Sequence, residues 1–432
     1  MITMRAEKPD QLLERSLFLL VAVIVLHSGW LLHSADPYEF LRHGGDALGY
    51  YQWLPATMIK GTVDKMFWTY EMDDGRSLSL FSCGVAILQL PFFLIGHLAA
   101  SVFHYDRNGF SSPYGVAQLV GAAIYTGAGC VLAFRIARRF AEAEGAMLAV
   151  LSLFAASNLF YYVVYEPTMS HMYSFFLVGL FIHCTLRLLD DPEHPPNKWH
   201  AAFFIISGSL LVLVRQLNVL VFLFPLMMAW RAPMGIRGFA RSLFSHRLIS
   251  IGFLVLALIP WLLQCLYWKH VLGEFFAFAY GKKGETFHFD KMVPGAILSS
   301  VRNGWLVYTP MMFPLVLALL FHAWRGTRTA RTILLVLTLT WLVYSAWWCW
   351  WLGTSFSYRG FVDLYALLVI PLAWLFGSIL RRNWSIRLVS TLTLVALIKL
   401  NFGLMERFNW QWSWHEWTWQ RFFAEVSAVI TA

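Results

Sequence analysis

Long apolar stretches separated by short polar segments run through almost the whole chain. The first, from Leu17 to Leu32, follows a polar and basic N-terminal segment. Most are close to the roughly 20 residues that a helix needs to cross a bilayer. The pattern therefore predicts an all-α polytopic membrane protein with about eleven transmembrane helices. The ten later stretches are residues 115–134, 145–163, 172–189, 200–214, 218–230, 248–268, 308–323, 332–351, 361–380 and 386–404.

A further apolar stretch, Val85–Phe103, is treated differently from the eleven. Polar or helix-perturbing residues interrupt it at Gln89, Pro91, Gly96 and His97. If it also crossed the membrane, every later basic cluster would move to the opposite side. We therefore expect a helix that lies along the outer interface or dips into it.

Clusters of arginine fix the predicted orientation. Cytoplasmic loops carry an excess of Lys and Arg. With eleven alternating spans, all four clusters fall on the side of the N-terminus, which we place in the cytoplasm. The acidic segment 190–198 falls on the same side, but acidic residues count little in this rule. The clusters are Arg135/Arg138/Arg139, Arg231/Arg237/Arg241/Arg247, Arg325/Arg328/Arg331 and Arg381/Arg382/Arg387.

Three long segments then face outward. The transmembrane domain is expected to cover residues 1–404, with a large first outer loop at 33–114 and a second at 269–307. The tail 405–432 is rich in tryptophan, which predicts an interfacial anchor, with sugar stacking as a less favoured alternative. Its tryptophans are Trp410, Trp412, Trp414, Trp417 and Trp419.

Composition agrees with the pattern. Of 432 residues, 59% are hydrophobic and 13% are charged, whereas a soluble domain carries roughly a quarter charged residues. This excludes an ordinary soluble enzyme and a disordered chain. The net charge of +9 reports topology, so no nucleic-acid partner is inferred from it. The five cysteines show no zinc-ligand spacing and no disulfide framework.

Acidic candidates gather in the first outer loop. Asp36, Glu39 and Asp46 lie close to the predicted membrane surface. Asp46 follows a Gly-Gly pair and precedes an aromatic amphipathic stretch. It could serve as a general base, or it could simply cap a helix, because Asp is a favoured N-cap residue.

A second group lies at the outward mouth between two predicted spans. Glu166, His171 and Tyr173 stand in the segment YYVVYEPTMSHMYSFF. Ionisable residues at the mouth of a span are candidates for function. The alternative is plain interfacial anchoring by a Tyr-rich belt.

Cationic candidates complete the set. Arg215 interrupts an apolar run and needs an anion there, either a substrate phosphate or a carboxylate such as Asp46. Arg359 and Asp363 are four residues apart and could pair on one helix face. Lys282 and Lys283 form a small basic patch, which is more often solvated or in contact with lipid headgroups.

No familiar catalytic signature is present, such as a Walker loop, GxSxG or HExxH. The predicted spans carry few ionisable residues at mid-membrane depth, where a cation-coupled transporter usually has them. The polar candidates gather instead at the outer face. This distribution favours chemistry at the outer membrane surface over transport across the membrane.

The arrangement resembles the GT-C superfamily of membrane glycosyltransferases, most of all the branch of protein O-mannosyltransferases and lipid A aminoarabinose transferases. Four features carry the resemblance: a long first outer loop with an early acidic residue (GGDALGYYQWLPA), an interfacial apolar helix (SCGVAILQLPFFLIGHL), a basic cytoplasmic cap (RIARRF) and a late SFSYRGFVD stretch. Relatives commonly carry two adjacent acidic residues where this chain has Asp46 alone, ten residues after Asp36.

The resemblance implies a glycosyltransferase of the inner membrane with its active site on the periplasmic face. It implies a polyprenyl-phosphate sugar donor and a glycan, lipid or protein acceptor. Asp46 would be the catalytic residue of an inverting transfer. Arg215 and Arg359 would bind the donor phosphate, with Lys282, Lys283 and His171 as second choices. A divalent metal is not favoured, since one carboxylate is a poor metal site.

Two other classes stay open at this stage. A flippase or transporter of lipid-linked saccharides would need a polar path through the membrane. A non-catalytic membrane scaffold would leave the arginine at a span mouth unexplained.

Overall fold

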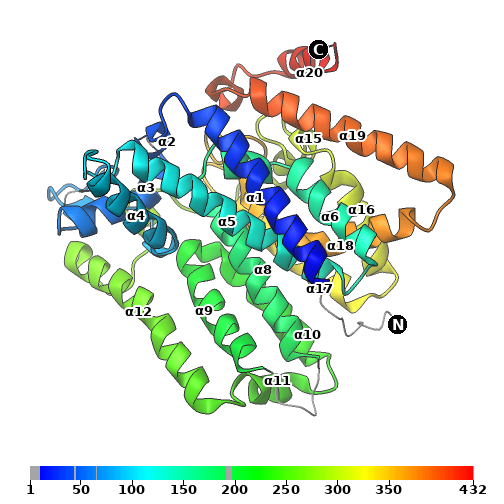
Figure 1. The fold of residues 1–432 in the computed structure, drawn as a ribbon, viewed down its shortest axis with the longest axis horizontal. Coiled ribbons are helices and arrows are strands. Elements are labelled where there is room, and N and C mark those ends of the chain that lie inside the picture. Colours follow the sequence, from blue (N-terminus) through cyan, green and yellow to red (C-terminus); the bar gives the residue numbers. More distant parts are fainter. Residues whose placement is uncertain (1–9, 43–44, 65, 191–196, 432) are drawn as a thin grey trace.

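The computed structural model describes residues 10–42, 45–64, 66–190 and 197–431. It is 72% helical with almost no strand, which confirms the predicted all-α class (Figure 1). The α-helices are α1 Gln11–His33, α2 Glu39–Arg42, α3 Asp46–Tyr51, α4 Gly84–Val102, α5 Ser112–Ala137, α6 Ala143–Ala155, α7 Leu159–Val164, α8 Ser170–Leu188, α9 Lys198–Val214, α10 Leu223–Trp230, α11 Gly235–Leu243, α12 Arg247–Leu272, α13 Ala279–Lys282, α14 Pro294–Ser299, α15 Trp305–Tyr308, α16 Met312–Trp324, α17 Arg328–Ser345, α18 Tyr365–Ile379, α19 Trp384–Arg407 and α20 Trp419–Thr431. The remaining elements are a π-helix, η1 Pro55–Ile59, three 3-10 helices, η2 Gln216–Phe222, η3 Arg359–Leu364 and η4 Trp410–Ser413, and one antiparallel hairpin, β1 Tyr70–Glu71 with β2 Ser77–Leu78.

The protein is a multi-pass membrane protein. Among the described residues, seven helices are long and apolar enough to cross a membrane, or up to eight if η2 and α10 form one bent span with α11. Every apolar stretch in the sequence prediction falls mainly on one helix or on a pair of consecutive helices. The seven include α4 and omit the shorter apolar helices α6, α9 and α16. The count of eleven spans therefore stays a prediction.

Apolar helices occupy two kinds of position. In α12 and α19, only 22% and 17% of the apolar window is buried. Apolar side chains that are exposed along a whole helix are stable in lipid but not in water. We therefore infer that these two helices face the bilayer. Figure 1 shows both at the edge of the molecule.

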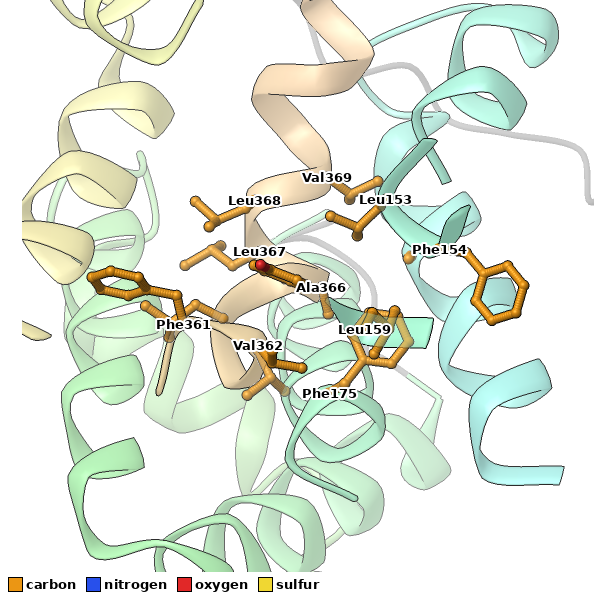
Figure 2. Close-up of a cluster of buried hydrophobic side chains, with 14 of the residues drawn as sticks. Leu153, Phe154, Leu159, Phe175, Phe361, Val362, Ala366, Leu367, Leu368 and Val369 are labelled. Atoms are coloured by element: carbon orange, nitrogen blue, oxygen red, sulfur yellow. The ribbon is translucent and has the colours of Figure 1, made fainter. Parts of the chain in front are cut away.

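The core surrounds α18, whose residues are almost all buried. Side chains of α6, α7, α8 and η3 close around it, as Figure 2 shows for Leu153, Phe175 and Leu367. Because its surface is apolar all round, α18 is stable only where neighbouring helices cover every face.

Helices α1 and α5 are antiparallel neighbours. Near the N-terminus, Glu14 accepts two hydrogen bonds from Arg135, at 2.9 and 2.7 Å. At the other end, Gly29 faces Leu119, and Gly115 lies against the Pro37 carbonyl group. Gly29 lets the two helices approach closely, and Gly115 makes room for the turn that follows α1. Helix α5 therefore runs from the predicted outer side to the predicted cytoplasmic side.

Helix α4 packs against the outer half of α5. Gly96 meets the backbone of Tyr114, and the Leu88 carbonyl group accepts a hydrogen bond from Tyr125 at 2.8 Å. Tyr125 lies about 20 Å along an α5 helix of roughly 39 Å. Helix α4 thus begins near the middle of α5 and ends at its predicted outer end. Its position along the outer interface stays a prediction.

Two predicted spans differ in shape from the prediction. The stretch 145–163 is broken between α6 and α7, at Ala156–Asn158. The stretch 332–351 stops being helical after Ser345, and residues 346–351 turn away from the helix axis. These residues carry four tryptophans, of which Trp347 and Trp348 line the cavity described below.

We predict that Gly115→Ala destabilises the protein by about 1–3 kcal/mol, the usual cost of overpacking. A methyl group at Gly115 would lie 1.7 Å from the Pro37 carbonyl oxygen. Gly252→Ala in lipid-facing α12 is the matched control, because nothing lies within 4 Å of a methyl group there. Thermal unfolding in detergent checks this. Equal midpoints for the two variants would contradict the packing of α5 against the 37–38 turn.

Candidate active site

One cavity of about 600 Å³ lies where the predicted outer loops meet the ends of α9 and α17. Two arginines, one aspartate and several tyrosines line it beside a wall of apolar and aromatic side chains. Its lining residues are Asp46, Tyr50, Arg215, Gln216, Leu217, Val219, Leu220, Phe278, Tyr280, Glu285, Phe287, Val343, Tyr344, Trp347, Trp348, Cys349, Leu352, Gly353 and Arg359.

Asp46 enters the cavity from the first turn of α3 and pairs with Arg359. Its carboxylate Oδ2 lies 2.7 Å from a terminal nitrogen of Arg359. The N-cap of α3 is Gly45, which adopts a left-handed φ of 91° that favours glycine. The alternative that Asp46 is itself the N-cap is therefore wrong. Tyr50 follows one turn later and lines the same cavity.

Arg215 is positioned by the end of α9, where the backbone becomes extended. Its Nε lies 2.9 Å from Oδ2 of Asp363. Its terminal nitrogens donate to the Tyr344 hydroxyl at 2.9 Å and to the Ser170 hydroxyl at 3.2 Å. These contacts hold the guanidinium rigidly at the cavity wall. Such a buried cation is tolerable only because a carboxylate neutralises it.

Asp363 is a buried carboxylate that contacts both Arg215 and His171. Its side chain is 2% exposed, and its Oδ1 lies 2.9 Å from Nδ1 of His171. Ring nitrogen Nε2 of His171 faces Arg215 at 3.5 Å. His171 is itself fully buried and does not line the cavity. The structure thus places His171 as a support for the Asp363–Arg215 pair.

Two pairings proposed from the sequence are wrong. Arg359 and Asp363 do not pair with each other, because residues 359–364 form a 3-10 helix. With three residues per turn, positions i and i+4 no longer share a face. The counter-ion of Arg215 is Asp363, and that of Arg359 is Asp46. The two arginines thus reach one cavity from separate carboxylates.

The loop before Arg359 is held in an unusual backbone conformation. Leu352 and Ser357 both have a φ of 59°, a region that non-glycine residues rarely occupy. The side-chain amide of Asn303 donates to the carbonyl groups of Trp351 and Gly353, at 2.8 and 3.0 Å. This buried clamp fixes the loop that carries Arg359 into the site. Backbone strain of this kind often accompanies functional sites.

Glu166 lies beside the Asp46–Arg359 pair, in the turn between α7 and α8. Burial raises the pKa of Glu166 to about 7, the charge of Asp46 raises it further, and the Arg359 guanidinium opposes the rise. Glu166 therefore changes its protonation near neutral pH. A carboxyl group tuned in this way is suited to acid–base work or to adjusting the charge of the site.

The remaining candidates lie outside the cavity. Lys282 pairs with Glu274 at 3.0 Å and Lys283 with Glu285 at 2.7 Å, and both lysines are exposed. Tyr173 is buried, with its hydroxyl 3.4 Å from the Pro167 carbonyl oxygen, away from the arginines.

The two other outer-loop carboxylates are also remote from the cavity. Asp36 accepts a hydrogen bond from the Tyr38 backbone N–H at 3.3 Å, which is a local turn. Glu39 begins α2 and is exposed. Neither side chain lines the cavity.

Several lining residues were not predicted from the sequence. Tyr50, Tyr280, Tyr344 and Glu285 all reach the cavity. Burial raises the pKa of Tyr50 and of Tyr280, so these two hydroxyls stay neutral hydrogen-bond donors. In a chain with 17 tyrosines, nothing in the spacing distinguishes these from interfacial ones.

The tryptophan-rich tail divides into two parts. Trp412 and Trp417 are buried and stack with ring centroids 4.6 Å apart. Trp410, Trp414 and Trp419 are about half exposed, as an interfacial anchor requires. The anchoring role of the tail stays a prediction.

The described donor side chains do not gather into a metal site. Among the described residues, no three His, Cys, Asp or Glu side chains come together as a possible metal cage. The Asp46 carboxylate is bonded to a guanidinium, whereas divalent cations need several oxygen ligands. Independence from a divalent metal stays a prediction, which chelation would test.

Comparison with solved structures establishes the fold that the resemblance in sequence implied. No protein-family model and no curated protein matches the chain. A structure of the archaeal oligosaccharyltransferase AglB from Archaeoglobus fulgidus, in complex with an inhibitory peptide and a dolichol-phosphate, superposes with a TM-score of 0.53 at 14% identity. The match covers 92% of this chain and 56% of the oligosaccharyltransferase chain.

Two further structures are similar. The apo oligosaccharyltransferase of Archaeoglobus fulgidus gives a TM-score of 0.52 at 12% identity, covering 95% of this chain and 56% of that one. ArnT from Cupriavidus metallidurans, bound to undecaprenyl phosphate, gives a TM-score of 0.47 at 14% identity. The match covers 96% of this chain and 76% of that one. The chain spans just over half the length of the oligosaccharyltransferases. At these identities the likeness to the two oligosaccharyltransferase structures establishes the fold alone.

We predict that Asp363→Asn is far more destabilising than Asp46→Asn. Asp363 is 2% exposed, and its loss leaves both Arg215 and the fully buried His171 without their shared carboxylate. Breaking such a pair costs about 3–5 kcal/mol. Asp46 is 31% exposed at the cavity, so we expect a loss of about 1 kcal/mol or less. Thermal unfolding in detergent measures both. Similar losses for the two variants would refute the separate roles of the two pairs.

Proposed function

We propose that this chain is a glycosyltransferase that uses a polyprenyl-phosphate-linked sugar and acts on the non-cytoplasmic face of the membrane. The observation that carries the proposal is the cavity. Arg215 and Arg359 reach it from segments far apart in the sequence, beside Asp46 and next to an apolar wall. A lipid phosphate that carries a sugar needs cations for the phosphate, polar groups for the sugar and apolar contacts for the tail.

The phosphate fits the two arginines. Guanidinium groups bind phosphate oxygens in a bidentate manner. The Nε of Arg359 is buried and has no hydrogen-bond partner among the described residues, so Arg359 has donor capacity to spare. The hydroxyls of Tyr50 and Tyr344 lie on the same wall and add neutral donors.

The lipid tail fits the apolar side of the cavity. Leu217, Val219 and Leu220 line it from η2, and Trp347 and Trp348 line it from the loop after α17. Val219 and Trp348 are each about half exposed, so the apolar wall continues to the outer surface of the protein. A prenyl chain could leave the cavity along this path without passing charged groups.

The fold supports the same donor class. AglB, whose fold this chain shares, was determined with a dolichol-phosphate and an inhibitory peptide. The bound lipid phosphate belongs to that protein. It supports the proposal that the shared membrane fold here serves a lipid-phosphate donor.

The chemistry proposed for the site is an in-line displacement. Asp46 accepts the proton of an acceptor hydroxyl as the hydroxyl oxygen attacks the anomeric carbon. The bond from that carbon to the phosphate oxygen breaks, and the lipid phosphate leaves with the electron pair. Arg215 and Arg359 stabilise the charge that develops on the phosphate. Attack from the face opposite the leaving group inverts the anomeric centre.

Donor binding would also release the base. In the structure, the Arg359 guanidinium neutralises Asp46 at 2.7 Å. A donor phosphate that shares Arg359 weakens this contact and leaves Asp46 a freer proton acceptor. Glu166, whose pKa lies near 7, stands close enough to compensate the change in charge. The proposed site thus links phosphate binding to activation of the acceptor.

We predict that the purified protein transfers sugar from a polyprenyl-phosphate donor and that Asp46→Asn lowers kcat roughly 100-fold or more, the usual range for loss of a general base. Arg359→Lys keeps the charge but loses bidentate geometry, so the KM for donor rises. Lys282→Gln is the control, because Lys282 pairs with Glu274 outside the cavity. A panel of radiolabelled donors with membrane extract as acceptor gives the readout.

Two outcomes would count against the proposal. Full activity of Asp46→Asn would remove the base assignment but leave the enzyme class. No transfer from any donor by folded wild-type protein would refute the class itself. Movement of a labelled lipid-linked saccharide across vesicle membranes without transfer would then support the flippase alternative.

A further inference from the structure

A second hollow of about 240 Å³ lies at the opposite end of the helix bundle, among the ends of α1, α5, α8 and α9. It is on the side of the N-terminus, which the arginine clusters predict to be cytoplasmic. It is remote from Asp46, and the proposed glycosyl transfer makes no use of it. Its walls combine arginines, histidines and two carboxylates with one phenylalanine.

Some of its charges are already compensated. Glu14 and Arg135 form a two-fold hydrogen-bonded pair, and Nε of Arg138 donates to Asp10 at 2.9 Å. Arginines near helix C-termini and acidic residues near helix N-termini also stabilise helix ends. These pairs are therefore explained by the fold alone.

Two groups in the hollow are not explained in this way. His183 is 6% exposed, and its Nδ1 has no hydrogen-bond partner among the described residues. Among the described residues, the ion-pair contact of Arg187, one turn later on the same face of α8, is with Asp190 at 3.6 Å. Asp190 is already bonded through both its carboxylate oxygens by Arg139. A buried polar atom without a partner and a weakly compensated cation together point to a missing anion.

An apolar groove adjoins the hollow. It has a volume of about 540 Å³ and shares Glu14 and Arg135 with the hollow as a common wall. Phe18, Leu19 and Val131 line it, and Leu19 is 60% exposed on lipid-facing α1. A polar hollow beside an apolar, lipid-facing groove has the shape of a site for a lipid headgroup and its chain.

We propose that this hollow binds the phosphate group of a lipid from the leaflet on the N-terminal side of the membrane. The phosphate accepts hydrogen bonds from Arg187 and His183, and an acyl chain lies in the groove along Phe18 and Leu19. A free phosphate could use the same polar groups, but only a lipid also uses the groove. The site is independent of the proposed transfer reaction.

The test is lipid binding by the delipidated full-length protein, measured by native mass spectrometry. Dioleoyl phosphatidate should bind saturably, and dioleoylglycerol, which lacks the phosphate, should bind at least about tenfold more weakly. His183→Phe and Arg187→Gln should each remove this binding event or weaken it about tenfold. Arg382→Gln changes an exposed arginine on the same side and should have no effect.

A further variant separates this site from the cavity at the outer end. Arg359→Lys should retain the binding event that His183→Phe and Arg187→Gln lose. Arg187 lies at the end of α8 and is partly exposed, so its variant should fold even if His183→Phe does not. Circular dichroism checks both.

Three results would overturn the proposal. Equal binding of dioleoylglycerol would remove the role of the phosphate. Unchanged phosphatidate binding by the folded Arg187→Gln variant would place the lipid elsewhere. Equally tight binding of inorganic phosphate, lost in the same variants, would show an anion site without a lipid chain.

Discussion

The structure depends on how two arginines are kept charged beside an apolar core. Arg215 is neutralised from behind by Asp363, which is buried and supported by His171. Arg359 is neutralised from the front by Asp46, which is part-exposed at the cavity. Removing one partner of a buried pair costs about 3–5 kcal/mol, because an uncompensated charge remains. The two pairs therefore have different roles. The Asp363–Arg215 pair stabilises the cavity wall, and the Asp46–Arg359 pair can separate when an anionic ligand binds.

The surrounding helices make this arrangement possible. Helix α18 is buried on all sides and carries η3 with Arg359 and Asp363 at its outer end. Helix α9 ends at Val214 and delivers Arg215 at the level where α4 begins, since Gly84 packs against the Leu213–Val214 backbone. The site thus lies where α9 ends and α4 and η3 begin. Helix ends and loops can leave regular geometry there because protein, and not lipid, surrounds them.

The sequence predicted the membrane helices because lipid imposes long apolar runs. It also singled out Asp46, Arg215, Arg359 and Asp363, since ionisable residues beside such runs are rare. It did not predict which carboxylate meets which arginine. That choice depends on the 3-10 geometry of residues 359–364 and on contacts between segments about 150 to 300 residues apart. Lys282 and Lys283 were expected near the phosphate because of their charge. Ion pairs with neighbouring glutamates hold both lysines outside the cavity. The lining tyrosines and Glu285 carry no signal in spacing.

The most direct test of this account is an experimental structure of the protein with a polyprenyl phosphate bound. The account predicts a phosphate between Arg215 and Arg359, with the Asp46–Arg359 contact longer than 2.7 Å and the Asp363–Arg215 pair unchanged. The prenyl chain should follow Leu217 and Val219 out of the cavity. A phosphate bound away from both arginines, or a broken Asp363–Arg215 pair, would contradict it.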